Sequence, residues 1–255
     1  MTVSFPVADL SQTRHADLDL SEETIELDAE AILGDGQSVS SVYDVTDERT
    51  QIENTGNVLT KSDLIAGDRK LEIRGETYGC VISASVVTKI ITSAQDLAMF
   101  RFTGSEQFDG YYILGNNIDA TEYSHFTQSW GGGSSPYGGY GLTGIFDGRG
   151  YVIDGITLTV GGLFGAIGNG GVVRNVGFTN TVLTGTANNV SLLAHYACAG
   201  ASVDNVFVHV SSWSATGNIS ALIVQLKDNT SNPAVPISLS NIFVVTPQAG
   251  GGGGT

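Results

Sequence analysis

Apolar and polar residues alternate in short runs through residues 17–90. The clearest runs are residues 24–29, 38–45, 70–74 and 78–87. A period of two indicates strands with one buried face. Glycine-containing turns at 34–36 and 66–68 separate these runs, and the last two face each other across a three-residue loop at 75–77. The pattern predicts a small antiparallel β-sandwich over residues 17–90, preceded by an N-terminal arm at 1–16.

A short helix is predicted between this sandwich and the rest of the chain. Ser93 and Asp96 have the spacing of a capping box, and the apolar Leu97 and Phe100 fall on one side of the turn that follows. We expect this helix to cap the domain that comes after it.

Residues 91–249 contain a repeat. The segments VRNVGF, VDNVFV and LSNIFV place Asn175, Asn205 and Asn241 at intervals of 30 and 36 residues. A second apolar cluster before each segment aligns Phe164, Leu193 and Ile223 at intervals of 29 and 30 residues. Two agreeing registers predict a stack of similar units.

Each repeat unit offers two or three short strands joined by Gly, Asn and Ser turns. One unit cannot bury its apolar face alone, whereas stacked units share a continuous core. The spacing therefore predicts a parallel β-helix in which Asn175, Asn205 and Asn241 form a structural ladder from coil to coil. A Gly-rich tail follows at 250–255, and no cap is predicted after Val245. We expect a partner subunit or downstream structure to cover that end.

Upstream of the repeat, three motifs carry a family resemblance. They are YYILGNNIDAT at 111–121, LTGIFDGRGYVIDGI at 142–156 and GGLFG at 161–165. In this order they resemble the opening coils of GLUG-type, pectin-lyase-like right-handed β-helices of bacterial surface proteins and phage appendages. Residues 17–90 resemble, by pattern, the immunoglobulin (Ig)-like modules of similar proteins. The resemblance implies an all-β chain with an Ig-like sandwich and a short right-handed β-helix, on a fold that serves lyases, hydrolases, adhesins and inert stalks alike.

Charge and glycine divide the chain in the same way. Residues 1–100 hold 18 acidic and 7 basic side chains with 6 glycines, whereas residues 101–255 hold 8 acidic and 4 basic side chains with 28 glycines. The step predicts a domain boundary near residue 100. The formal net charge of −15 argues against nucleic-acid binding, and no apolar run is long enough for a membrane span.

The acidic side chains give little sign of catalysis. The second half offers Asp109, Asp119, Glu122, Asp147, Asp154, Asp204 and Asp228. Asp109 and Asp147 lie in Phe-Asp-Gly, which is typical of a turn aspartate bonded to its own backbone. Arg149 and Arg174 are single bases, and the four histidines show no ligand spacing. We therefore predict no catalytic, cofactor-binding or metal-binding residue, and two thiols, Cys80 and Cys198, without a disulfide.

A long loop at 124–140 is the candidate contact surface. Trp130, Tyr137 and Tyr140 could stack on sugar rings or on a partner protein. The alternative is that these aromatic rings pack back onto the coil or onto a neighbouring subunit.

Three classes of function remain. The first is a bacteriophage virion structural protein (a decoration, head-fibre or tail-appendage protein) that forms a homo-oligomer, with three chains as the first guess. It would contact capsid or tail proteins and, in addition, a host-surface glycan. The second is a bacterial cell-surface adhesin, and the third a polysaccharide lyase or hydrolase. The sequence start, MTVSFPVADL, lacks the features of a secretion signal. We therefore expect a virion location rather than an extracellular or cell-surface one, and no enzymatic activity.

Overall fold

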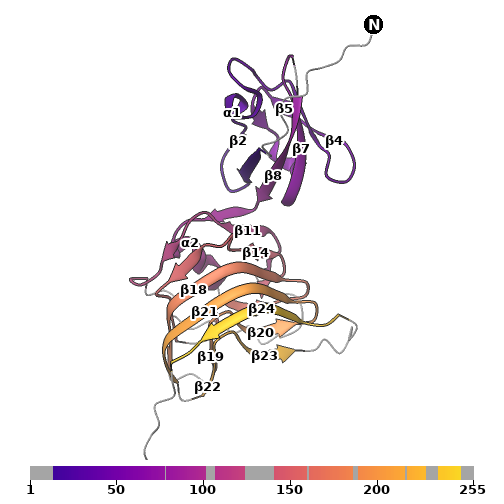
Figure 1. Ribbon diagram of the computed structural model, residues 1–255. Helices are drawn as coiled ribbons and strands as arrows, with labels where there is room; N and C mark the ends of the chain where they lie inside the picture. Colours follow the sequence, from indigo (N-terminus) through magenta and orange to yellow (C-terminus); the bar gives the residue numbers. More distant parts are fainter. Residues whose placement is uncertain are drawn as a thin grey trace, which may run out of the picture. The chain divides into compact units, whose positions relative to one another are not determined.

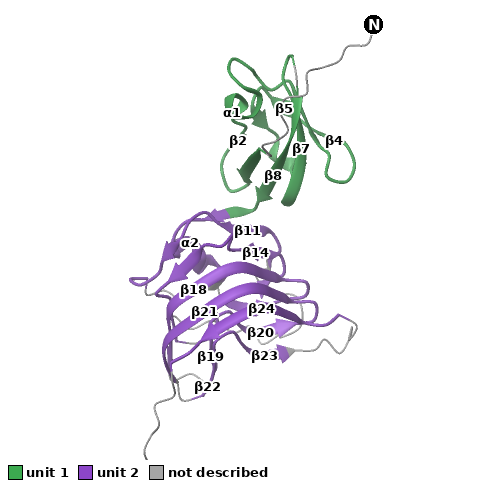
Figure 2. Ribbon diagram, in the orientation of Figure 1, with its two compact units in different colours: residues 1–89 green, residues 90–255 purple. Residues whose placement is uncertain are grey.

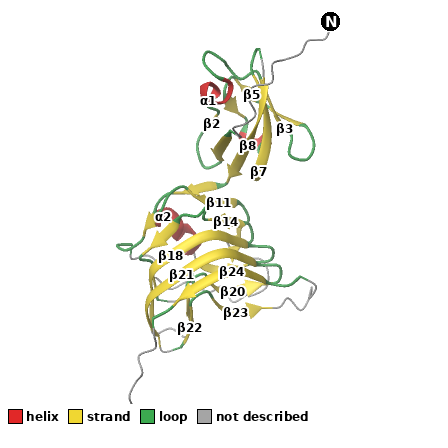
Figure 3. Ribbon diagram, in the orientation of Figure 1, coloured by secondary structure: helices red, strands yellow, loops and turns green. Residues whose placement is uncertain are grey.

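The computed structural model describes residues 14–77, 79–101, 107–123, 141–159, 161–185, 189–215, 217–227 and 235–247 (Figure 1). The chain divides into two compact units, residues 1–89 and 90–255 (Figure 2). The described part is mostly strand, in several sheets, with only short helices (Figure 3), so the protein is all-β. The composition step placed the boundary near residue 100, about ten residues too late, because residues 80–103 contain no glycine and the rise in glycine begins only at Gly104.

The first unit contains a five-stranded sheet and a three-stranded sheet. The larger sheet has the order β1-β8-β7-β3-β4, with β1 His15–Asp19, β8 Gly79–Val87, β7 Gly67–Arg74, β3 Ser41–Asp44 and β4 Thr50–Ile52. The smaller sheet has the order β2-β6-β5, with β2 Ile25–Glu26, β6 Val58–Leu59 and β5 Asn54–Thr55. A 3-10 turn, η1, spans Lys61–Asp63. Leu71 and Ile73 are fully buried and alternate with the polar residues Lys70, Glu72 and Arg74, which explains the period-two pattern.

Several predictions for this unit were wrong in detail. β1 pairs in parallel with β8, so the larger sheet is not purely antiparallel, and His15 belongs to the sheet rather than to an arm. The run at 24–29 ends in a helix, α1 Ala29–Leu33, because the Asp28 carboxylate caps it by accepting from the Ala31 amide at 3.0 Å. The loop between β7 and β8 spans four residues instead of three, since Arg74 pairs with Gly79. β7 begins at Gly67, inside the predicted turn at 66–68.

The second unit is a stack of parallel strands (Figure 1). One sheet holds β9 Lys89–Ile91, β11 Tyr111–Leu114, β14 Ile145–Asp147, β18 Val172–Gly185, β21 Ser202–Ala215 and β24 Ser238–Val245, with β12 Ile118–Asp119, β15 Val152–Asp154 and β16 Thr157–Leu158 joined to it. A second sheet holds β10 Gln107–Phe108, β13 Gly141–Leu142, β17 Phe164–Ile167, β20 Ala194–Cys198 and β23 Ile223–Lys227. A third pairs β19 Asn189–Ser191 with β22 Asn218–Ser220. Equivalent segments of successive repeats therefore lie side by side.

The pairing of the strands confirms the predicted alignment of the three asparagines and corrects the predicted alignment of the second apolar cluster. Arg174 pairs with Asp204 and Asp204 with Ser240, so the asparagine after each lies in one column. In the second sheet Phe164 pairs with Ala194, and Ala194 with Ile223. The predicted alignment of Phe164 with Leu193 was wrong by one residue, because two adjacent leucines offered two apolar positions for one register.

The core of the stack is continuous and apolar. Val173 and Val203 occupy one inward column and Phe178 and Val208 another, and all four are fully buried. At the start of the stack, helix α2 Ala94–Leu97 continues into a 3-10 turn, η2 Ala98–Arg101. The predicted cap forms: the Ser93 hydroxyl accepts from the Asp96 amide at 3.1 Å. Leu97 at the end of α2 and Phe100 in η2 both belong to the hydrophobic core.

Candidate functional site

The sequence-predicted contact residues Trp130, Tyr137 and Tyr140, and the candidate acid Asp228, lie outside the described residues. The polar chemistry that the structure describes gathers where the long strands of the stack bend. There the register brings Asp147, Arg174, Asp204 and Ser240 into one column on β14, β18, β21 and β24. We call this set the bend column.

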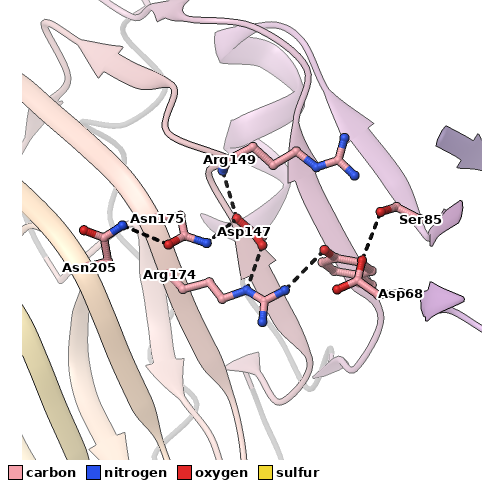
Figure 4. Close-up of polar contacts among 8 residues, drawn as sticks. Asp68, Ser85, Asp147, Arg149, Arg174, Asn175 and Asn205 are labelled. Carbon is pink, nitrogen blue, oxygen red and sulfur yellow. Dashed lines mark hydrogen bonds and ion pairs between the residues drawn. The ribbon is translucent and has the colours of Figure 1, made fainter. Parts of the chain in front are cut away.

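The Asp147 carboxylate is the most buried group of the bend column, at 5% exposure. One oxygen, Oδ1, accepts from the Arg149 amide at 2.8 Å and from Asn175 Nδ2 at 3.1 Å, and the other accepts from Arg174 Nε at 2.7 Å (Figure 4). Arg174 Nη2 also donates to the Tyr111 hydroxyl at 3.3 Å. A buried carboxylate needs this many donors to offset its desolvation. Asp147 and Arg174 together therefore join three neighbouring strands, β11, β14 and β18.

The three repeat asparagines sit at the bend with left-handed backbones. Their φ angles are 54° at Asn175, 51° at Asn205 and 51° at Asn241. Asparagine tolerates this region better than other non-glycine residues, and this tolerance explains its recurrence at the position. The bend lets one long strand turn while its inward residues stay in register.

The predicted asparagine ladder is continuous over one step only. Asn205 Nδ2 donates to Asn175 Oδ1 at 2.9 Å (Figure 4). Asn241 Nδ2 instead donates to the Asp204 carboxylate at 2.9 Å. The carboxylate is the stronger acceptor, so it captures the amide that would otherwise continue the ladder. Sequence reasoning missed this because it considered the asparagines without their preceding residues.

Two other described acids of this unit, Asp154 and Asp119, are also bonded to their own chain, whereas Asp109 and Glu122 are exposed. Asp154 Oδ1 accepts from Thr179 Oγ1 at 2.5 Å and from Asn180 Nδ2 at 2.7 Å, and Asp119 Oδ1 accepts from the Thr121 amide at 2.9 Å. The Thr121 amide and side chain hold the pKa of Asp119 below its usual value. Asn180 again has a left-handed backbone, with φ 50°. Asp154 therefore fastens its turn to the neighbouring strand β18, whereas Asp119 bonds within its own turn.

One arrangement in the first unit, which sequence reasoning missed, resembles a nucleophile site. Ser85 Oγ donates to Asp68 Oδ1 at 3.0 Å (Figure 4) and lies 3.4 Å from His15 Nε2. The same Nε2 lies 3.0 Å from Asp17 Oδ1. A catalytic triad uses the two ring nitrogens separately, one for the serine and one for the carboxylate. Ser85 is also only 1% exposed, so the cluster stabilises the β1–β8 edge rather than forming a site.

Within the described ranges no cluster of three His, Cys, Asp or Glu side chains is placed to hold a metal ion. No helix in that part of the chain is both long and apolar enough to cross a bilayer. Cys80 and Cys198 remain thiols. Among the histidines, His195 stacks on Tyr196 with ring centroids 4.2 Å apart.

No protein-family model, curated protein or solved structure gives a significant match to this chain. The functional argument therefore depends on the geometry of the bend column and the stack around it.

We predict that Asp204 makes the last coil acid-sensitive. The pKa of Asp204 lies below its ordinary value of 3.8 because Ser240 Oγ donates to it at 2.6 Å, and Asn241 also donates to it. A carboxyl with a lowered folded pKa stabilises the fold above its unfolded pKa, and this contribution is lost as the pH falls through the folded value. Wild type should therefore be more stable than Asp204→Asn near neutral pH, and the difference should shrink below pH 3.8.

Urea unfolding at several pH values, followed by far-UV circular dichroism, measures this difference. A stability gap between wild type and Asp204→Asn that is the same near neutral pH and at about one pH unit below the unfolded pKa would contradict the assignment.

Proposed function

We propose that residues 17–90 form an Ig-like β-sandwich and that residues 91–249 form a short right-handed β-helix. The parallel registers from β11 to β24 support the second assignment, since each repeat advances the chain by one strand in every sheet. Parallel connections of this kind are almost always right-handed. The eight strands in two sheets of the first unit support a sandwich with one parallel edge.

On this fold we propose a non-enzymatic structural protein of a bacteriophage virion, of the decoration, head-fibre or tail-appendage type. One observation carries the proposal: four of the candidate acids in the described part of the second unit, Asp119, Asp147, Asp154 and Asp204, accept hydrogen bonds from the chain itself. The other two described candidates, Asp109 and Glu122, are exposed and belong to no cluster of three His, Cys, Asp or Glu side chains in that part of the chain. A general acid or a metal ligand has to offer an oxygen to substrate or ion. Asp147, Asp154 and Asp204 serve instead to link neighbouring repeats, as a rigid display scaffold requires, whereas Asp119 bonds within its own turn.

The proposed protein acts as a homo-oligomer in contact with capsid or tail proteins, and the stack faces outwards. The loop that contains Trp130, Tyr137 and Tyr140 remains the candidate for a host-surface glycan. No cofactor is part of this function.

Particle composition tests the proposal directly. Mass spectrometry of purified phage particles, made from the genome that encodes the chain, is expected to detect it in a fixed ratio to the major capsid protein. If the particles lack the chain and the bacterial surface fraction contains it, the adhesin class is correct instead.

An activity assay tests the non-enzymatic part separately. The chain, incubated with a panel of acidic and neutral polysaccharides with and without Ca²⁺, is expected to release no reducing or unsaturated sugar ends. If ends are released, and Asp147→Asn or Asp204→Asn reduces the release while Asp19→Asn in the first unit does not, the polysaccharide-cleaving class is correct.

A further inference from the structure

The last strand of the stack, β24, leaves its inward side chains uncovered. Leu239 continues the column of Val173 and Val203 but is 47% exposed, whereas both valines are fully buried. Val244 continues the column of Val208, which is fully buried, and is 38% exposed. The hydrophobic core therefore stops at an open end.

The backbone at this end is also available for pairing. In the described part of the chain, β24 pairs with β21 alone, β22 with β19 alone, and β23 with β20 alone. Three strands thus present an edge on the same side of the stack, with β24 in yellow as the outermost strand of its sheet (Figure 1). An edge with apolar side chains is a template for another strand.

The neighbouring segments of this sequence offer no side chains for that core. Residues 228–234 read DNTSNPA and residues 248–255 read QAGGGGGT, so neither contains a large apolar residue. Only large apolar side chains can bury Leu239, Ile242 and Val244 favourably.

Charge indicates what can approach. The chain carries a net charge of −15, yet β24 and β22 contain no charged residue and β23 contains only Lys227, at its last position. A basic or acidic partner would find no complementary charge on β24 and β22, whereas a second copy can pair its β24 with this β24 without like-charge repulsion between the two strands. The rest of the chain is acidic, so two copies repel each other there. They repel each other least where they meet at this end.

The opposite end of the stack does not match. There Leu97 and Phe100 fill the core and are 0% and 2% exposed. If copies stacked head to tail, the open end of one copy would meet the α2 end of the next, whose core is already covered. If two open ends meet, the exposed apolar side chains of both copies become buried.

We propose that two copies of this chain join through their open ends, with β24 of one copy against β24 of the other around a two-fold axis. Two-fold symmetry makes the paired strands antiparallel, and the two apolar cores become one. The interface closes on itself, so the assembly is a dimer rather than the trimer expected by analogy with phage fibres. The inference concerns the contact of the chain with itself and does not depend on the proposed virion role.

Sedimentation velocity of the full chain over a range of concentrations tests the proposal. Wild type should reach twice the monomer mass of 26.6 kDa. Leu239→Lys puts a charged side chain from each copy into the joined apolar core and should weaken association roughly 100-fold. Val81→Lys is the matched control, because Val81 is 49% exposed and lies on β8 of the first unit. This variant should associate like wild type.

Hydrogen exchange provides a second measurement that needs no variant. The β24 amides of wild type should exchange more slowly at concentrations where the dimer forms than at dilution, while those of β7 should not change. A monomer at every concentration overturns the proposal. So does a trimer, a dimer that Leu239→Lys leaves intact while Leu239→Lys remains folded, or an oligomer without added protection in β24.

Discussion

Replacing Phe100 with alanine is expected to lower the free energy of unfolding of the second unit by about 3–5 kcal/mol. The Phe100 ring is 2% exposed and lies at the start of the stack. Its centroid is 5.1 Å from those of Phe108 and Tyr112, 5.6 Å from that of Phe146 and 5.0 Å from that of Phe164, all edge-to-face. Alanine would remove four aromatic contacts and leave a cavity that the paired strands around it cannot close.

Tryptophan fluorescence during urea unfolding isolates this effect. Both tryptophans of the chain, Trp130 and Trp213, belong to the second unit, so their emission reports that unit and not the first. Phe243→Ala is the matched control because Phe243 is 63% exposed and stacks on Phe207 alone among the described rings. At a dilute concentration, where association does not contribute, its midpoint should move little. Equal shifts of the urea midpoint for the two variants would show that the buried Phe100 ring stabilises the stack no more than an exposed ring does.

Phe100 also illustrates what the sequence pattern could and could not predict. The helix around it follows from local chemistry, since Ser93 and Asp96 form their cap within four residues. The aromatic partners of the Phe100 ring come from β10, β11, β14 and β17. The sequence pattern alone does not predict that the ring lies deep enough between these strands to contact all four. The period-two alternation and the asparagine interval are local and repeated, so strands and stacking could be predicted. The α1 helix was missed because its five residues, fewer than two turns, are too short for apolar spacing to distinguish a helix from a strand.

The bend column shows the same limit at the level of side chains. The interpretation of Asp147 as a turn aspartate was right about its bond to the Arg149 amide. Its ion pair with Arg174 joins residues 27 positions apart and is visible only once the strand register is known. Register depends on which apolar positions enter the core, and the error of one residue at Leu193 shows how easily adjacent leucines conceal it.

Replacing Gly144 with alanine is expected to cost about 3 kcal/mol of the stability of the second unit, at the upper end of the usual range for overpacking. Gly144 occupies a corner that repeats from coil to coil: the amide of Ile145 donates to the Gly110 carbonyl, and the amide of Val172 donates to the Gly144 carbonyl. A Cβ at Gly144 would lie within 3.0 Å of the Gly110 oxygen and of the Asp109 carbonyl group. These are backbone atoms held by the strand pairing, so they cannot move aside without breaking the ladder.

Gly170→Ala separates this steric explanation from a conformational one. Gly170 has a φ of +75°, and a Cβ added there would meet no atom within 4 Å, so alanine costs only the unfavourable backbone, about 1–2 kcal/mol. The φ angle of Gly144, by contrast, lies outside the left-handed region, and there is no space for a Cβ atom at this position. If glycine serves these coils mainly by close approach, Gly144→Ala must shift the urea midpoint of tryptophan emission further than Gly170→Ala. The reverse order would mean that backbone freedom, rather than the spacing between coils, explains why glycine gathers in this half of the chain.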